Sequence, residues 1–134
     1  MDFELLKKQV AEDLNLTPDT AELKSLKISS IYIRYLDLYM ENLRKLKSIQ
    51  SQKESVYAKL VIKFQREGVD GYAVKGKDCD YYACLDTEYQ AKVGEVKEQE
   101  FIVSYLEKVL EQINKVSFNI KNFCDLQKVK LGIG

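Results

Sequence analysis

Apolar side chains recur at alternating steps of four and three residues through the first half of the chain. A sustained period of about 3.5 residues packs a helix along one continuous seam, as in coiled coils. Glycine and proline are both absent between residues 19 and 67, so the pattern predicts one long helix over 18–67, with Thr17 as N-cap and Pro18 in its first turn. The seam, in which only Gln50 and Lys53 are polar, consists of Tyr32, Leu36, Tyr39, Leu43, Leu46, Gln50, Lys53, Tyr57, Leu60 and Phe64.

The same spacing returns near the C-terminus and predicts a second long helix over 97–130. A parallel apolar stripe that includes Val103 and Leu110 widens its seam. Helices that are apolar over such a width pack against more than one neighbour, so we expect a helical bundle or a homo-oligomeric ring. The residues that we expect to mediate oligomerisation are Ile102, Leu106, Val109, Ile113, Val116, Ile120 and Phe123.

Shorter elements precede and separate these helices. Apolar residues at helical spacing predict a short helix over 2–15. A glycine-rich loop and a short element occupy 68–94. The short element, over 79–92, fits either a helix or a strand, and we expect Leu85 to be its buried anchor. Gly94 and an acidic run then lead into the C-terminal helix. The chain of 134 residues is therefore expected to be a single all-α domain.

The net charge is zero, but its distribution along the chain is uneven. Residues 44–66 carry seven Lys or Arg against Glu54 alone, whereas 68–100 carry four against eight Asp or Glu. A basic run of this kind is either a solvated helix face or an anion-binding strip. Lys45, Lys59 and Arg66 share one outward heptad position if the seam is buried, with Lys63 one turn away.

The sequence lacks the residues that several kinds of catalytic and metal-binding site require. The chain contains no histidine, which excludes Ser-His-Asp and histidine-metal sites, and it contains no glycine-rich phosphate loop. Three cysteines without a paired motif favour reduced thiols, and no apolar run is long enough to cross a membrane. We therefore expect no enzyme activity, no catalytic residues, no metal and no cofactor, and a cytoplasmic protein.

Two patches of sequence resemble the UvsY-like recombination mediators of T-even-type bacteriophages. The tail carries Ser117-Phe118-Asn119-Ile120-Lys121, followed by Asp125-Leu126 and Gly132 at the family's spacing, and the long helix carries Tyr35-Leu36, Ile49, Gln52 and Lys53. The order of elements is also similar. One difference lies on the long helix, where the family has a Lys-x-Arg pair and this chain reads Ala58-Lys59-Leu60.

The resemblance implies a function and a set of partners. UvsY-like mediators bind single-stranded DNA that is coated by a single-strand-binding protein, weaken that coat, and load and stabilise a RecA-like recombinase. They act as closed homo-oligomeric rings, here expected to be a hexamer or heptamer, in the cytoplasm of an infected bacterial host cell. They hydrolyse nothing themselves.

The cations predicted to contact DNA lie on both long helices. Single-strand binding without base specificity requires cations that follow the phosphates. The alternative is a structural or adaptor coiled-coil protein, such as a phage assembly scaffold or chaperone, in which the same cations only solvate the surface. The candidate DNA-binding residues are Arg44, Lys45, Lys47, Lys59, Lys63, Arg66, Lys121 and Lys128.

Overall fold

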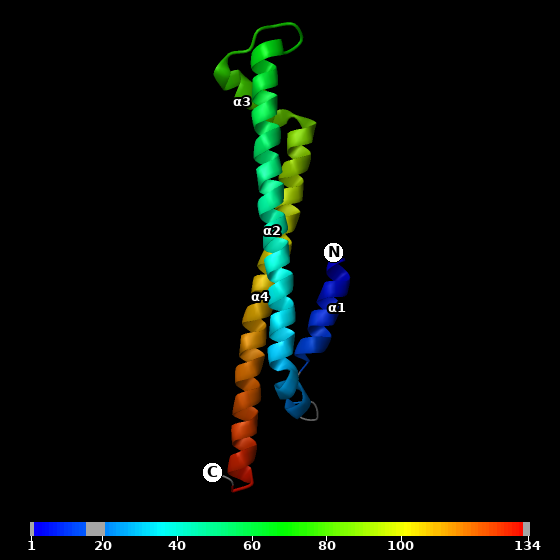
Figure 1. The fold of residues 1–134 in the computed structure, drawn as a ribbon, viewed down its shortest axis with the longest axis vertical. Helices are drawn as coiled ribbons and strands as arrows, with labels where there is room; N and C mark the ends of the chain where they lie inside the picture. The colour runs from blue at the N-terminus through cyan, green and yellow to red at the C-terminus, as the bar shows by residue number, and fades with distance from the viewer. Residues whose placement is uncertain (1, 16–20, 133–134) are drawn as a thin grey trace. The chain divides into compact units, whose positions relative to one another are not determined.

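The computed structural model describes residues 2–15 and 21–132, and within these ranges every side chain except those of residues 21–26, 120, 123, 124 and 127. It contains the helices α1 (Phe3–Leu14), α2 (Ala21–Glu67), α3 (Gly76–Leu85) and α4 (Thr87–Lys130), shown in Figure 1. The described residues form no strand, so the all-α prediction is confirmed. Within the same residues, no helix combines the length and the apolar character needed to cross a bilayer.

Helix α2 follows the predicted seam. Leu46 and Leu60 are buried, and the other eight seam residues are partly buried, including the polar Gln50 and Lys53. None of the ten is exposed, which confirms that this face packs inward. The predicted cap at Thr17 and Pro18 lies outside the described residues.

A tight turn ends α2. The Gly68 backbone has a φ of +69°, and a Cβ added there would lie 2.0 Å from the Tyr72 carbonyl oxygen, so only glycine fits this position. Asp70 and Gly71 follow with φ values of +50° and +82°, while Val69 and Tyr72 exchange backbone hydrogen bonds. Positive φ at both central residues is the geometry of a type I′ turn, for which Asp-Gly is a preferred pair. The chain is thereby turned back toward α3.

The ambiguous middle element is a helix, and its anchor differs from the prediction. Leu85, expected to be buried, is 57% exposed at the end of α3. Cys79 and Ala83 are fully buried instead. These two residues are four apart and therefore share one face of the helix, where their small side chains allow α3 to approach its neighbours closely.

Helix α4 begins earlier than predicted. It starts at Thr87, where the Asp86 side chain accepts a hydrogen bond of 2.9 Å from the Glu88 backbone N–H as an N-cap does. Gly94 lies inside the helix, with open space around its Cβ position. The prediction that Gly94 precedes the helix and that the acidic run forms its first turn is therefore wrong.

The chain divides into two compact units, to each of which α2 and α4 contribute; the expected single domain stays a prediction. The terminal unit comprises residues 1–41 and 104–134. Here α1 is attached to α2 through Asp13, which pairs with Arg34 and accepts a hydrogen bond of 2.7 Å from the Tyr35 hydroxyl. The buried core of the described part of this unit consists of Leu6, Val10, Tyr35, Leu106, Val109 and Ile113.

The central unit comprises residues 42–103. Its core includes a polar pair, in which the Gln99 amide donates hydrogen bonds of 2.9 and 3.0 Å to the backbone and side-chain oxygens of Asn42. The pairing of Asn42 with Gln99 and of Gln52 with Lys92 makes α2 and α4 antiparallel within this unit. The apolar members of the core are Leu46, Leu60, Cys79, Ala83, Val96 and Val103.

Candidate nucleic-acid interface

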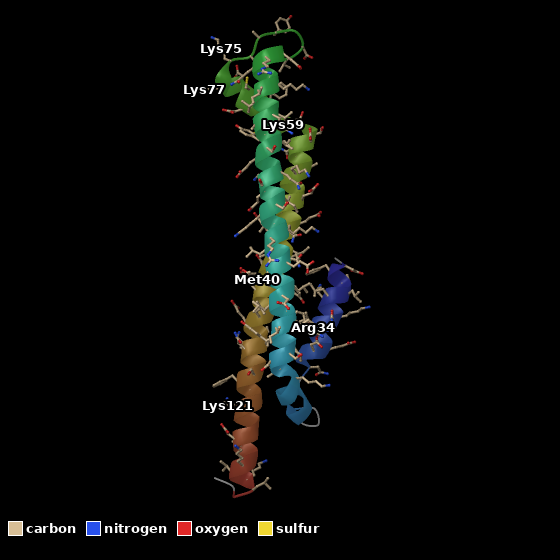
Figure 2. The ribbon with its side chains drawn as sticks, viewed as in Figure 1. Arg34, Met40, Lys59, Lys75, Lys77 and Lys121 are labelled. Carbon is tan, nitrogen blue, oxygen red and sulfur yellow. The ribbon has the colours of Figure 1, made fainter. Side chains whose placement is uncertain are left out.

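Six of the predicted DNA-binding cations lie on the part of α2 that belongs to the central unit. All six are exposed. At about 100° per residue, Lys45, Lys59, Lys63 and Arg66 fall within about 60° of one another around the helix. We call these four residues the basic strip; Lys59 is labelled in Figure 2. The full set of six is Arg44, Lys45, Lys47, Lys59, Lys63 and Arg66.

The inward seam determines where the basic strip points. Leu46 and Leu60 mark the buried side of α2, and the four exposed residues of the strip lie away from it, with Lys59 and Arg66 the farthest. None of the ion pairs among the described residues uses any of the six cations. Their charges are therefore available to an anionic ligand rather than neutralised by neighbouring carboxylates.

The remaining two cations of the prediction belong to the terminal unit. Lys121, labelled in Figure 2, and Lys128 are exposed on the last part of α4. They are seven residues apart, so they lie on the same side of the helix. Exposure is compatible with DNA contact and with simple solvation.

The predicted oligomerisation stripe is partly covered by the chain itself. Leu106, Val109 and Ile113 are buried in the terminal unit, while Ile102 and Val116 are partly exposed. The side chains of Ile120 and Phe123 lie outside the described part of the chain. Oligomerisation through this stripe stays a prediction. The side chains near the end of α4 that one chain leaves largely exposed are Phe118, Leu126, Val129 and Leu131.

A groove lies next to the covered part of that stripe, within the terminal unit. It has a volume of about 360 Å³. Ile28, Tyr32 and Ile33 of α2 line one side, and Ile113 and Ser117 of α4 line the other. Ile33 is 57% exposed there, which leaves an apolar surface between the two helices.

A smaller cleft in the central unit brings together residues that the sequence did not associate. The Tyr57 and Tyr89 rings are 5.6 Å apart between centroids, and Lys53 and Glu54 complete the lining. The Tyr57 hydroxyl donates a hydrogen bond of 2.5 Å to Asp80 of α3. That hydrogen bond is the main reason why the pKa of Tyr57 is raised to about 12. Tyr89 belongs to α4, and only the folding of the chain places it beside Tyr57.

Among the described residues, no group of three or more Cys, Asp or Glu side chains is placed to hold a metal ion. Cys79 is buried and Cys84 is exposed, each as a free thiol.

Comparison with known proteins identifies a family. Residues 9–133 match the family model described as "Recombination, repair and ssDNA binding protein UvsY". No curated protein sequence matches the chain.

Solved structures with a similar fold include crystal structures of the bacteriophage T4 recombination mediator protein UvsY. The lattice type IV structure has a TM-score of 0.83 at 12% identity, covering 97% of this chain and 99% of that one. The lattice type II structure has a TM-score of 0.82 at 14% identity, with 98% of each chain covered. At such low identity these matches establish a shared fold.

Proposed function

The chain belongs to the UvsY family of recombination, repair and single-stranded-DNA-binding proteins, and from this we propose that it is a recombination mediator that binds single-stranded DNA. The mediator destabilises the coat of single-strand-binding protein on the DNA and loads and stabilises a RecA-like recombinase. It does so by binding alone, without catalytic chemistry. The observation that carries the proposal is the exposed basic strip on α2, whose cations are unpaired among the described residues.

The basic strip suits a ligand that is recognised by its phosphates. Lys45, Lys59, Lys63 and Arg66 lie on one face of a regular helix, so their charges are arranged along a line. Each cation that neutralises a phosphate releases condensed counterions, which favours binding without reading the bases. The missing Lys-x-Arg pair is compensated in this proposal by Lys63 and Arg66, which follow Lys59 on the same face.

We propose further that the chain works as a homo-oligomer, a hexameric or heptameric ring. Support comes from the terminal unit, where apolar side chains are exposed in the last part of α4 and directly after it, at Phe118, Leu126, Val129 and Leu131. Contact with other copies would remove this surface from water. Several copies of a modest basic strip along one DNA strand give tight binding from weak individual contacts.

Reversal of two charges tests the proposal. We expect Lys59→Glu with Lys63→Glu to weaken binding to a labelled single-stranded oligonucleotide at least tenfold in fluorescence anisotropy. The dependence of log affinity on log salt should become shallower by about 1.4, at about 0.7 per lost phosphate contact. Lys108→Glu with Lys115→Glu is the matched control, because it makes the same charge change at exposed positions of α4 outside the candidate set.

The alternative, a structural or adaptor coiled-coil protein, predicts a different result. In that case the oligomeric state would be unchanged in sedimentation, and both double variants would behave like the original protein toward DNA. Equal losses in the two double variants would show that total charge matters and the basic strip does not.

A further inference from the structure

We propose that the cleft lined by Lys53, Glu54, Tyr57 and Tyr89 binds one nucleobase of the single strand; the proposal rests on the proposed DNA-binding function. Three of these residues come from α2 and Tyr89 comes from α4, all within the central unit. The cleft would add contacts to the bases that the basic strip, which faces phosphates, does not provide.

The size of the cleft limits what it can hold. Its volume is about 160 Å³. Pockets for whole small-molecule ligands begin at about 300 Å³. The cleft is thus too small for a complete nucleotide and suits a single flat ring system whose sugar and phosphate stay outside.

The two tyrosines form a rigid stacking surface. Their ring centroids are 5.6 Å apart with an angle of 51° between the planes, so they contact each other and leave no space for a base between them. A base would instead lie against the exposed part of the Tyr89 ring in the cleft. Tyr57 is held in place by its hydrogen bond to Asp80 and contacts the Tyr89 ring. Stacking on aromatic side chains is how single-strand-binding proteins commonly hold bases.

Lys53 and Glu54 supply polar partners at the edge of the cleft. Lys53 interrupts an otherwise mostly apolar seam and is partly buried, and no ion pair among the described residues involves it or Glu54. The ammonium group can reach the phosphate of the bound nucleotide. A glutamate carboxylate accepts a hydrogen bond from the N4 amino group of cytosine, whereas thymine presents an oxygen acceptor there. The cleft should therefore favour cytosine over thymine.

The cleft lies on a different face of α2 from the basic strip, so the two contributions can be separated. Lys47 is the candidate cation on the side of the cleft, because it precedes Glu54 by seven residues and thus lies about 10 Å away along nearly the same line. Substitutions in the cleft leave all four residues of the basic strip intact.

Binding to oligonucleotides with and without bases provides the first test. We expect the protein to bind an all-cytosine oligonucleotide roughly 5- to 150-fold more tightly than one with abasic interior positions, the range for stacking of one base. Equal affinity for the two would overturn the base-binding cleft and leave phosphate binding by the basic strip in place. Absence of binding to any single strand would overturn both proposals.

Variants of Tyr89 locate the effect. Tyr89→Leu keeps an apolar side chain but removes the aromatic face, so its affinity for the cytosine strand should fall to that of the abasic strand. Tyr89→Phe should retain the original preference. Phe101→Leu is the matched control on α4, since Phe101 is 60% exposed and lies about 18 Å further along the helix. An equal loss in Tyr89→Leu and Tyr89→Phe would show that the hydroxyl group, and not the aromatic face, carries the effect, and would contradict the proposal.

Base preference gives a readout that does not depend on whether Tyr89→Leu folds. The original protein should bind all-cytosine strands more tightly than all-thymine strands, and Glu54→Gln should reduce that ratio while far-ultraviolet circular dichroism stays unchanged. A cytosine-to-thymine ratio that Glu54→Gln leaves unaltered would remove Glu54 from the site.

Discussion

The two short helices, one in each unit, are attached to α2 by the same polar contact in different surroundings. Asp13 of α1 accepts a hydrogen bond from the Tyr35 hydroxyl, and Asp80 of α3 accepts one from the Tyr57 hydroxyl. Tyr35 is 1% exposed, whereas Tyr57 is only partly buried. A hydrogen bond that is shielded from water is more costly to lose, so the same pair of residue types should stabilise the terminal unit more.

The apolar contacts of the two short helices differ as well. Helix α1 buries Leu6 and Val10, whereas α3 buries the smaller Cys79 and Ala83. Large side chains contribute more area removed from water, while small ones allow close approach and leave no room for enlargement. The first contact is therefore sensitive to loss of volume and the second to gain of volume.

The largest effect is expected from a cavity under α1. Leu6→Ala should lower the free energy of unfolding by about 2–5 kcal/mol, because the side chain is 4% exposed and its removal leaves a void. Leu5 directly precedes Leu6 and is 63% exposed, so Leu5→Ala should change the free energy of unfolding by less than about 0.5 kcal/mol. Urea unfolding at one fixed protein concentration measures both. Similar losses of unfolding free energy in the two variants would mean that α1 is not packed against the rest of the terminal unit.

A smaller effect is expected from overpacking under α3. Ala83→Leu should lower the free energy of unfolding by about 1–3 kcal/mol, since Ala83 is fully buried. Hydrogen exchange should show faster exchange of the α3 amides. Ala91→Leu, at an exposed position of α4 in the same unit, is the control and should leave both measurements unchanged. If Ala83→Leu were neutral, the close approach of α3 would not be a constraint.

The smallest effect is expected from removal of the hydroxyl groups. Tyr35→Phe should lower the free energy of unfolding by about 1 kcal/mol at neutral pH, and Tyr57→Phe by less, because its hydrogen bond is more accessible to water. Chemical denaturation at neutral pH ranks the two variants. A larger loss in Tyr57→Phe would reverse the comparison between the units.

The pH dependence of stability checks the Tyr35 contact separately. Burial, followed by the hydrogen bond to Asp13, raises the pKa of Tyr35 above its usual 10.0 in the folded protein. The unfolded chain therefore loses this proton first, so the stabilisation is complete below about pH 10 and is lost as the pH rises further. The decline in unfolding free energy above about pH 10 should be shallower in Tyr35→Phe.

The two long helices could be predicted because their apolar pattern repeats over many turns. The residue at which α4 begins could not be predicted, because the pattern does not mark it. In the sequence Gly94 indicates a helix boundary, but one glycine at an exposed helix position costs only about 1 kcal/mol, which a helix of 44 residues tolerates. The usable signal was Asp86, a side chain of the type that caps helices, directly before Thr87. The sequence predicts Leu85 as the anchor, whereas the structure buries Cys79 and Ala83, whose small side chains allow close packing.

The candidate site divides in the same way. The heptad pattern predicts that the basic strip is exposed. Once the buried seam is known, the direction of each remaining position on the helix is known as well. The contacts of Tyr57 with Asp80 and Tyr89 join different helices, and no local pattern specifies them. The heptad pattern predicts Tyr57 only as a seam residue, and the packing of α2, α3 and α4 places it in the cleft.

The hydrogen-bonded, buried side chains of Asn42 and Gln99 restrict how α2 and α4 can align with each other. If α4 slid by one turn along α2, or if a helix from another copy took its place out of alignment, the Gln99 amide would face apolar side chains and its two hydrogen bonds to Asn42 would be lost. Each unsatisfied buried group costs about 1–3 kcal/mol, so misaligned pairings are rejected during folding and assembly. A fully apolar seam of repeating heptads would tolerate such errors. The buried pair of Asn42 and Gln99 therefore favours one alignment of α2 and α4 along their axes.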